Sequence, residues 1–201
     1  LGPESSIVDA LINDEVSQKV LSFIAPILEE ATQVHGRVSA SFDRAEFPIG
    51  GDDGRTMTVN GNIVFNDVVF GAGPLGGELL SLVGKGPQTA LRIHQPIQLA
   101  IANRRISQSG LEIPINQETK ITIRGSVGFD ETLALRADVP ITNAMLGRDK
   151  VLQDLAAGTT IPVPIGGTLT HPKADRRALG AALKEVTRSI FKRGAEQEAT
   201  E

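Results

Sequence analysis

The stretch Thr119–Ile141, TKITIRGSVGFDETLALRADVPI, predicts one long β-hairpin from which the rest of the fold can be built. Apolar and polar residues alternate along both arms, the pattern of strands with one buried and one solvated face. The turn falls at Asp130-Glu131, and because no helix separates the arms, they must be antiparallel. The apolar row of this hairpin consists of Ile121, Ile123, Val127, Leu133, Leu135 and Val139.

Length and composition limit the class of protein. A chain of 201 residues holds one domain of ordinary to large size, or two small ones, and can bury a core without disulfides. With seven Phe but no Tyr or Trp, it offers few platforms for base stacking, and its net charge of −4 disfavours nucleic acid and anionic surfaces. We therefore expect no nucleic-acid partner. The absence of cysteine excludes disulfides and thiolate metal sites.

The pattern on either side of the hairpin predicts further antiparallel strands between two amphipathic helices. After a loose N-terminal segment at 1–6, we expect a single domain over 7–193 and a disordered tail over 194–201. Its elements are a helix at 7–33, strands over 37–141 with a short helix at 74–84, a strand at 160–169, and a helix at 175–193. The apolar stripes of the two long helices are Val16, Val20, Ile24, Ile27 and Ala31, and Leu179, Leu183, Val186 and Ile190.

This order of elements predicts an α+β fold. We expect a long, strongly curved antiparallel sheet, a meander, wrapped on the N- and C-terminal amphipathic helices. Gly61 and Gly125 interrupt strand patterns and would mark bends. Asn60-Gly61 fits a hairpin turn or a bulge within one strand, and we favour the bulge.

A formal nucleotide-binding motif occurs at Gly71-Ala72-Gly73-Pro74-Leu75-Gly76, which matches G-x-G-x-x-G. That fingerprint requires a parallel βαβ unit, whereas the neighbouring strands alternate as in an antiparallel sheet. About twenty residues further on, where an acidic residue should bind the ribose, the chain has Leu91, Arg92 and His94. The glycines are better explained as releasing the chain from the sheet into a short helix.

The residues suited to acid–base catalysis form no recognisable constellation. The histidines, His35, His94 and His171, lie far apart and fit no metal-binding spacing. The candidate carboxylates Asp43, Asp67, Asp130 and Asp138 mostly occupy polar faces or turns, and solvated carboxylates are poor catalysts at neutral pH. We expect a non-enzymatic protein without cofactor or metal. A pocket that joins two or more of His35, His94, Asp43 and Asp130 would instead indicate an enzyme.

The last predicted helix has a basic side. Its residues are Arg176, Arg177, Lys184, Arg188, Lys192 and Arg193. A solvated face is the favoured interpretation, and contact with phosphate headgroups or an acidic partner is the alternative.

Two stretches of the second half resemble a known family. GSVGFDETLALRADVPI (Gly125–Ile141) and IPVPIGGTLTHPKAD (Ile161–Asp175) are similar to the C-terminal region of AsmA-like proteins, where a G-x-x-x-x-D strand precedes an L-x-L-x-x-x-x-P-I strand and a later G-T-L-x-x-P-K segment. The resemblance extends over roughly residues 56–175. The chain departs from it at Asn103-Arg104-Arg105-Ile106, which replaces the usual Asn-Gly turn.

The resemblance implies a periplasmic or envelope protein of a diderm bacterium, associated with outer-membrane biogenesis and phospholipid transport along a β-groove. AsmA-like proteins are usually anchored by an N-terminal helix, and we expect this chain, which starts Leu1-Gly2-Pro3, to belong to a longer membrane-anchored protein. The family supplies no active-site residues.

Two states of the apolar face follow from these expectations. In the first, the face is open and a phospholipid or acyl chain contacts the lipid-facing candidates Ile121, Ile123, Val127, Leu133, Leu135 and Val139. In the second, the protein's own helices close the face, leaving a structural or protein-interaction module with an envelope protein as partner. The sequence leaves both open.

Overall fold

The structure, a computed structural model, describes residues 5–12, 21–29, 31, 34–46, 57–86, 90–93, 95–117, 119–147 and 150–198. These residues form an α+β fold dominated by one open antiparallel sheet of ten strands. The strands are β1 (Ser5–Leu11), β2 (His35–Glu46), β3 (Thr58–Phe70), β4 (Leu91–Ile93), β5 (Ile97–Ala102), β6 (Arg105–Pro114), β7 (Lys120–Gly128), β8 (Leu133–Pro140), β9 (Thr160–Gly167) and β10 (Pro172–Ala174). The helical elements are α2 (Ser22–Ile24), η2 (Pro26–Leu28), α3 (Pro74–Leu82), α4 (Asn143–Leu146), α5 (Lys150–Ala156) and α6 (Arg176–Glu198).

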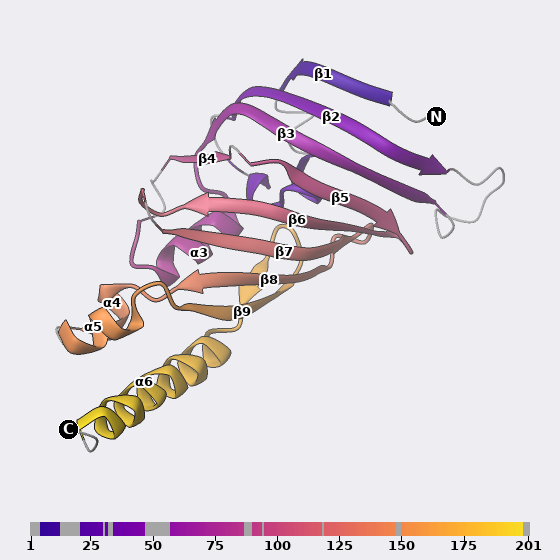
Figure 1. The fold of residues 1–201 in the computed structure, drawn as a ribbon. Coiled ribbons are helices and arrows are strands. Elements are labelled where there is room, and N and C mark those ends of the chain that lie inside the picture. Colours follow the sequence, from indigo (N-terminus) through magenta and orange to yellow (C-terminus); the bar gives the residue numbers. More distant parts are fainter. Residues whose placement is uncertain are drawn as a thin grey trace.

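The sheet is a meander in the order β1-β2-β3-β5-β6-β7-β8-β9-β10, with β4 paired beside β3 (Figure 1). Its hairpin β7–β8 confirms the predicted one, with Thr122 opposite Asp138 and Val127 opposite Leu133. At the turn the backbone amide of Gly128 donates to the carbonyl of Thr132 at 2.8 Å, and Glu131 takes a positive φ of 65°.

Asn60-Gly61 lies inside one long strand, β3, rather than in a hairpin turn, as expected, but the bulge itself is in the partner strand β2. Phe42 pairs with Gly61 and Arg44 pairs with Asn60, so the extra residue is Asp43 of the partner strand β2. A Cβ atom on Gly61 would collide with the carbonyl oxygen of Ser41. Glycine is therefore required here because the bulged strand approaches closely.

The glycine-rich motif opens α3, in agreement with its structural interpretation. Gly73 directly precedes Pro74, the first helical residue, and a Cβ atom on Gly73 would collide with the carbonyl oxygen of Glu29. The flanking strand β3 pairs antiparallel with β2, β4 and β5. The parallel βαβ unit that a dinucleotide site needs is thus not formed around this motif.

The predicted helix at 7–33 is wrong in its first part, where β1 pairs antiparallel with β2. The β-branched residues Ile7 and Val8 favour a strand, and the free edge of β2 offers unpaired backbone groups that β1 satisfies. A bulge interrupts the pairing, with Asp9 at a φ of 54°.

Among the residues of the remaining predicted helix that the structure describes, the helical elements are α2 and η2. Ile24 and Ile27 of the predicted stripe are buried, and Ala31 packs partly against the core. Val16 and Val20 lie outside the described residues.

The C-terminal prediction also needs correction, because α6 continues to Glu198 through residues expected to be disordered. Ala195, Glu196 and Gln197 are good helix formers, so the propensity of this segment extends the helix beyond Gly194. Residues 199–201 lie outside the described part of the chain.

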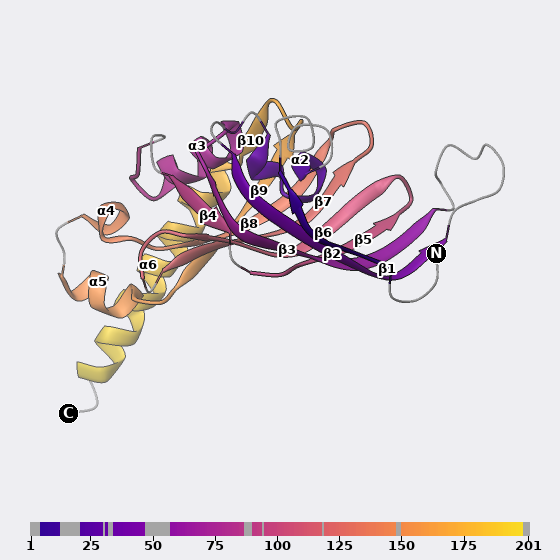
Figure 2. The same cartoon turned by 90° about the horizontal axis from the view of Figure 1, so that it is seen from above.

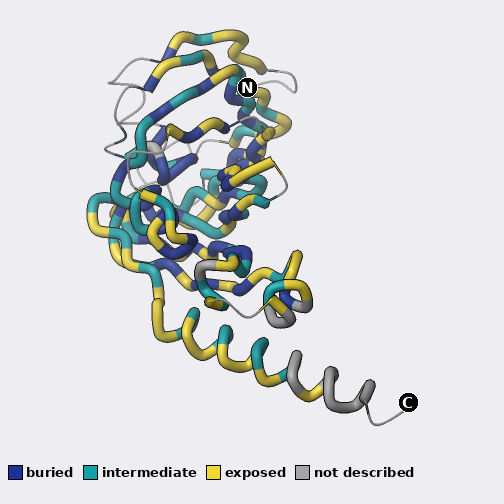
Figure 3. Tube along the Cα trace, turned by 90° about the vertical axis from the view of Figure 1, so that its left-hand side faces the viewer, coloured by how far each residue is buried: buried dark blue, intermediate teal, exposed yellow. Residues whose placement is uncertain are grey.

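The helical elements do not share one layer. Figure 2 shows α2 and α3 on one side of the sheet, with β10 curling towards them, and β10 contacts α3. The long helix α6 starts beside β9 and extends away from the sheet (Figure 1). In Figure 3 exposed and half-buried residues alternate along it. Its Leu179 and Leu183 pack against the core from the sheet's margin.

Candidate functional site

The six side chains of the predicted row lie in the interior of the protein. Their exposed fractions range from 0% for Ile121 and Ile123 to 7% for Leu133. They belong to a continuous buried cluster that also contains Leu75 and Leu79 of α3. We call the inward face of β7, β8 and β9 with the side chains packed on it the closed core. In this structure the predicted row packs against the protein's own residues.

A second part of the same apolar face is hollow. It is a groove of about 380 Å³ between α2 and the strands β1, β2, β3, β5 and β6, and we call it the apolar groove. The sheet contributes Ile7, Ala10, Val38, Ala40, Phe42, Ile63, Leu99, Ile101 and Ile106, and the segment around α2 contributes Leu21, Phe23 and Ile24.

The apolar groove is open because its floor and its cover are both small. Ala10 and Ala40 reach only a short way from the floor, and Gly61 leaves a gap in the row between Phe42 and Leu99. The described cover is a single short helix, α2, whereas the nine-residue α3 packs into the main core. Ile7, at the outer wall, is 52% exposed.

The apolar groove also lacks charge, since each residue that lines it is apolar. A charged group placed among them would lose hydration without gaining a counter-ion. The groove therefore suits hydrocarbon. Sequence reasoning noticed the alternation of Val38, Ala40 and Phe42, but it missed the groove because β1 was assigned to a helix.

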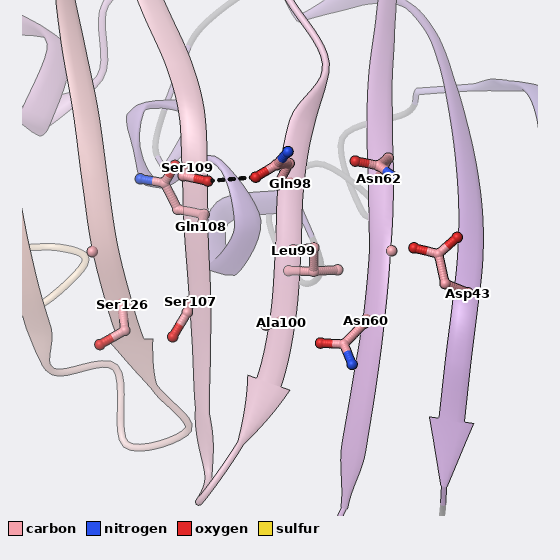
Figure 4. Close-up of a pocket in the computed structure, with 12 residues that line it drawn as sticks. Asp43, Asn60, Asn62, Gln98, Leu99, Ala100, Ser107, Gln108, Ser109 and Ser126 are labelled. Carbon is pink, nitrogen blue, oxygen red and sulfur yellow. Dashed lines mark hydrogen bonds between the residues drawn. The ribbon is translucent and has the colours of Figure 1, made fainter.

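The opposite face of the sheet carries a shallow polar trough, drawn in Figure 4, with a volume of about 600 Å³. It is lined mainly by amide and hydroxyl groups, and the Ser109 hydroxyl donates to Oε1 of Gln98 at 3.2 Å. Asp43 is the carboxylate at its margin, and among the described lining residues no histidine or second carboxylate accompanies it. The described lining of the trough thus lacks the pair of acid and base side chains that general acid–base catalysis would need.

The other residues considered for catalysis are dispersed. His35 starts β2, His171 follows β9 with its Nδ1 3.0 Å from the Thr170 hydroxyl, and His94 lies outside the described residues. Asp67 of β3 is exposed, and Asp138 of β8 forms ion pairs with Arg124 and Arg136.

Asp130 has a structural partner at the β7–β8 turn. Its Oδ1 accepts hydrogen bonds from the Thr132 hydroxyl at 2.7 Å and the Thr132 amide at 3.2 Å. These bonds lower the pKa of the Asp130 carboxyl below its usual value, and the nearby Arg105 adds a smaller effect in the same direction. Arg105 also donates to Ser126 Oγ at 2.8 Å. This cluster fixes the turn.

The basic side of α6 is partly neutralised within the protein. Arg176 donates through two nitrogens to the carboxylate of Glu78 in α3, at 3.1 and 3.0 Å, which raises the pKa of the guanidinium. Arg188 pairs with Glu185 at 3.1 Å. These contacts favour a structural explanation for two of the six basic residues.

Within the described part of the chain, we find no helix long and apolar enough to span a membrane. The described residues also contain no group of three or more histidine, aspartate or glutamate side chains that could hold a metal ion.

Comparisons with known proteins add no relative: neither a protein-family model, a curated protein nor a solved structure matches this chain.

Proposed function

We propose that this chain is a non-enzymatic, lipid-binding domain of the cell envelope, and that the apolar groove holds or guides an acyl chain. The observation that supports the proposal is a hollow of about 380 Å³ with an entirely apolar lining, next to a core that is otherwise packed. Ligand pockets of 300–1,000 Å³ are typical of proteins that bind small molecules.

The dimensions of the groove suit one chain. From β1 to β6 it crosses five neighbouring strands, which corresponds to about 19 Å at ~4.8 Å per strand. Each methylene group removed from water contributes about 0.8 kcal/mol, so an acyl chain of this length gains enough to exceed the cost of its own immobilisation. The predicted row of β7 and β8 then supports the groove from the closed core rather than touching the lipid.

The cellular setting of the proposal comes from the AsmA-like resemblance. It favours a periplasmic domain within a longer, membrane-anchored protein that serves outer-membrane biogenesis. In that setting a phospholipid would supply the acyl chain. The wrapping of the sheet by both terminal segments is part of the same proposal, with the segment around α2 covering the groove and α6 covering the margin at β9.

Blocking the groove tests the proposal. Ala40→Trp places an indole on the groove floor, and Ala134→Trp places the same group at an exposed position of β8. Native mass spectrometry and displacement of a fluorescent fatty acid should show one bound chain for the unmodified protein and for Ala134→Trp. Ala40→Trp should bind at least about tenfold more weakly, because the indole occupies the space. Absence of binding by the unmodified protein, or equal binding by both variants, would refute the proposal.

A protein-interaction module is the second candidate, and the edge strand β1 favours it. Val8 and Leu11 are 76% and 69% exposed, on a strand whose outer edge has no neighbour among the described strands. Such an edge can accept a strand from an envelope protein. A photo-cross-linker at position 8 should then capture one defined partner in the envelope, and failure to capture any would count against this candidate.

A further inference from the structure

Charge is distributed unevenly between α6 and the remainder of the chain. The segment Arg176–Glu198 contains six basic and three acidic residues, which gives the helix a formal net charge of +3. Because the whole chain carries −4, the residues outside α6 together carry −7. The overall charge therefore conceals a basic helix attached to an acidic remainder, and an anionic partner can contact the first without the second.

The basic residues of α6 form a stripe along one face of the helix. They recur at spacings of seven, four and four residues, and they are Arg177, Lys184, Arg188 and Lys192. We call these four residues the basic stripe. All four are exposed, and the helix rises about 22 Å between the first and the last. Ala181, also exposed, occupies the position between the first two on the same face.

The opposite side of α6 is held by the protein. Leu179, Ala182 and Leu183 pack against the core. The contact of Arg176 with the carboxylate of Glu78 in α3 ties down the first turn. The basic stripe therefore points away from the sheet, on a helix that extends beyond the margin of the sheet (Figure 1, Figure 3).

Most of the basic stripe has no counter-ion within the described structure. Arg177, Lys184 and Lys192 form no ion pair with a side chain that the structure describes. Arg188 pairs with Glu185 at 3.1 Å, but the two side chains are 79% and 70% exposed. Such exposed pairs are weak, so Arg188 can exchange this partner for another anion. The stripe thus offers a row of accessible positive charges.

We propose that the basic stripe docks this domain on the surface of an anionic phospholipid bilayer. A straight row of charges on a convex helix, with alanine between them, attracts anions without shaped or directional recognition, which suits a flat and fluid layer of headgroups. The same surface repels the remainder of the chain with its charge of −7, which orients the protein with α6 towards the bilayer.

This docking surface is separate from the apolar groove. The stripe belongs to α6, which starts beside β9, whereas the groove lies between α2 and the strands from β1 to β6. Bilayer docking therefore goes beyond the proposed binding of an acyl chain, and it is measured by vesicle binding rather than by ligand displacement. Failure of one proposal leaves the other standing.

Vesicle flotation at low ionic strength tests the docking surface. Each basic residue close to an anionic membrane strengthens binding about fivefold, so Lys184→Gln/Lys192→Gln should weaken binding to phosphatidylglycerol vesicles by about thirtyfold. The matched control, Arg92→Gln/Arg104→Gln, removes the same charge from exposed positions in β4 and the β5–β6 turn. The control should bind within about twofold of the unmodified protein, because its changes lie outside the screened contact.

The unmodified protein should bind phosphatidylglycerol vesicles, should release them as added salt screens the charges, and should leave pure phosphatidylcholine vesicles unbound. Equal weakening in both variants, or equal binding to both kinds of vesicle, would overturn the inference. So would a protein that binds polyglutamate or duplex DNA but not phosphatidylglycerol vesicles, because its partner would then be an acidic macromolecule instead of a bilayer.

Discussion

The closed core and the apolar groove lie on the same face of the same sheet, yet one is packed and the other is hollow. In the closed core, Ile121 and Ile123 of β7 are fully buried, in one cluster with Leu79 of α3. In the groove, Ala40 and Ile106 border a space of about 380 Å³, and the described residues place one short helix, α2, over it. Alternation along a strand thus predicts which face is apolar, whereas the covering elements decide whether that face is packed or left hollow.

The largest expected difference concerns matched isoleucines in neighbouring strands. Ile123→Ala should lower the free energy of unfolding by about 2–5 kcal/mol, because it leaves a cavity in the closed core. Ile106→Ala should lower it by no more than about 1 kcal/mol, because Ile106 already faces a hollow. Urea unfolding of both variants measures the contrast. Equal losses would show that the two parts of the face are packed alike.

A smaller loss of stability is expected from substitution of Gly125, which lies between the closed core and the apolar groove. Gly125 has a φ of 134°, and a Cβ atom there would collide with the carbonyl oxygen of Ala134. Gly125→Ala should therefore destabilise the protein by about 1–3 kcal/mol. Gly166→Ala in β9 is the control, because open space surrounds its Cβ position. Thermal unfolding that gives the same result for both variants would contradict the strained backbone and the close approach at Gly125.

The attachment of α6 beside the closed core should depend on its first turn. The carboxylate of Asp175 accepts hydrogen bonds from the amides of Arg177 and Ala178, at 3.0 and 2.9 Å. Asp175→Ala should cost about 1 kcal/mol in unfolding free energy, and Asp175→Asn should cost much less because asparagine is also a good N-cap. Hydrogen exchange should show faster opening of α6 in the alanine variant, with the groove strands unaffected. Exchange that accelerates equally in the groove would contradict this separation.

The smallest effect concerns pH at the hairpin turn. Because hydrogen bonds from Thr132 lower the pKa of Asp130, the folded protein binds this proton less tightly than the unfolded chain. The hydrogen bonds to the Asp130 carboxylate therefore stabilise the folded protein above the pKa that Asp130 has in the unfolded chain. This stabilisation is lost as the pH falls through the pKa that Asp130 has in the folded protein. Carboxyl NMR should show Asp130 titrating below 3.8, and Thr132→Val should move that pKa upward. A titration at or above 3.8 in the unmodified protein would disprove the turn geometry.

The local patterns of the sequence predicted much of the sheet. The hairpin at 119–141, the continuous strand through Asn60-Gly61 and the short helix after Gly73 follow from alternation, turn residues and glycine, which act over a few residues. The strand β1 could not be predicted in the same way. Ser5–Leu11 is too short for a clear period, and its conformation depends on pairing with β2, about thirty residues further along the chain.

The site was harder to predict than the fold for a related reason. The row from Ile121 to Val139 was correctly assigned to an apolar face, but its burial within the core cluster depends on tertiary contacts that the alternation does not contain. The apolar groove joins Ile7, Phe42 and Ile106, which lie far apart in the sequence.

The most direct test of an acyl chain in the groove uses isoleucine methyl groups as reporters on both parts of the face. Protein labelled at the isoleucine δ1 methyls is titrated with dodecanol and followed by NMR. The account predicts that the methyls of Ile7, Ile63, Ile101 and Ile106 shift, while those of Ile113, Ile121, Ile123 and Ile161 keep their positions. Shifts confined to the second group, or no shifts at saturating ligand, would contradict it.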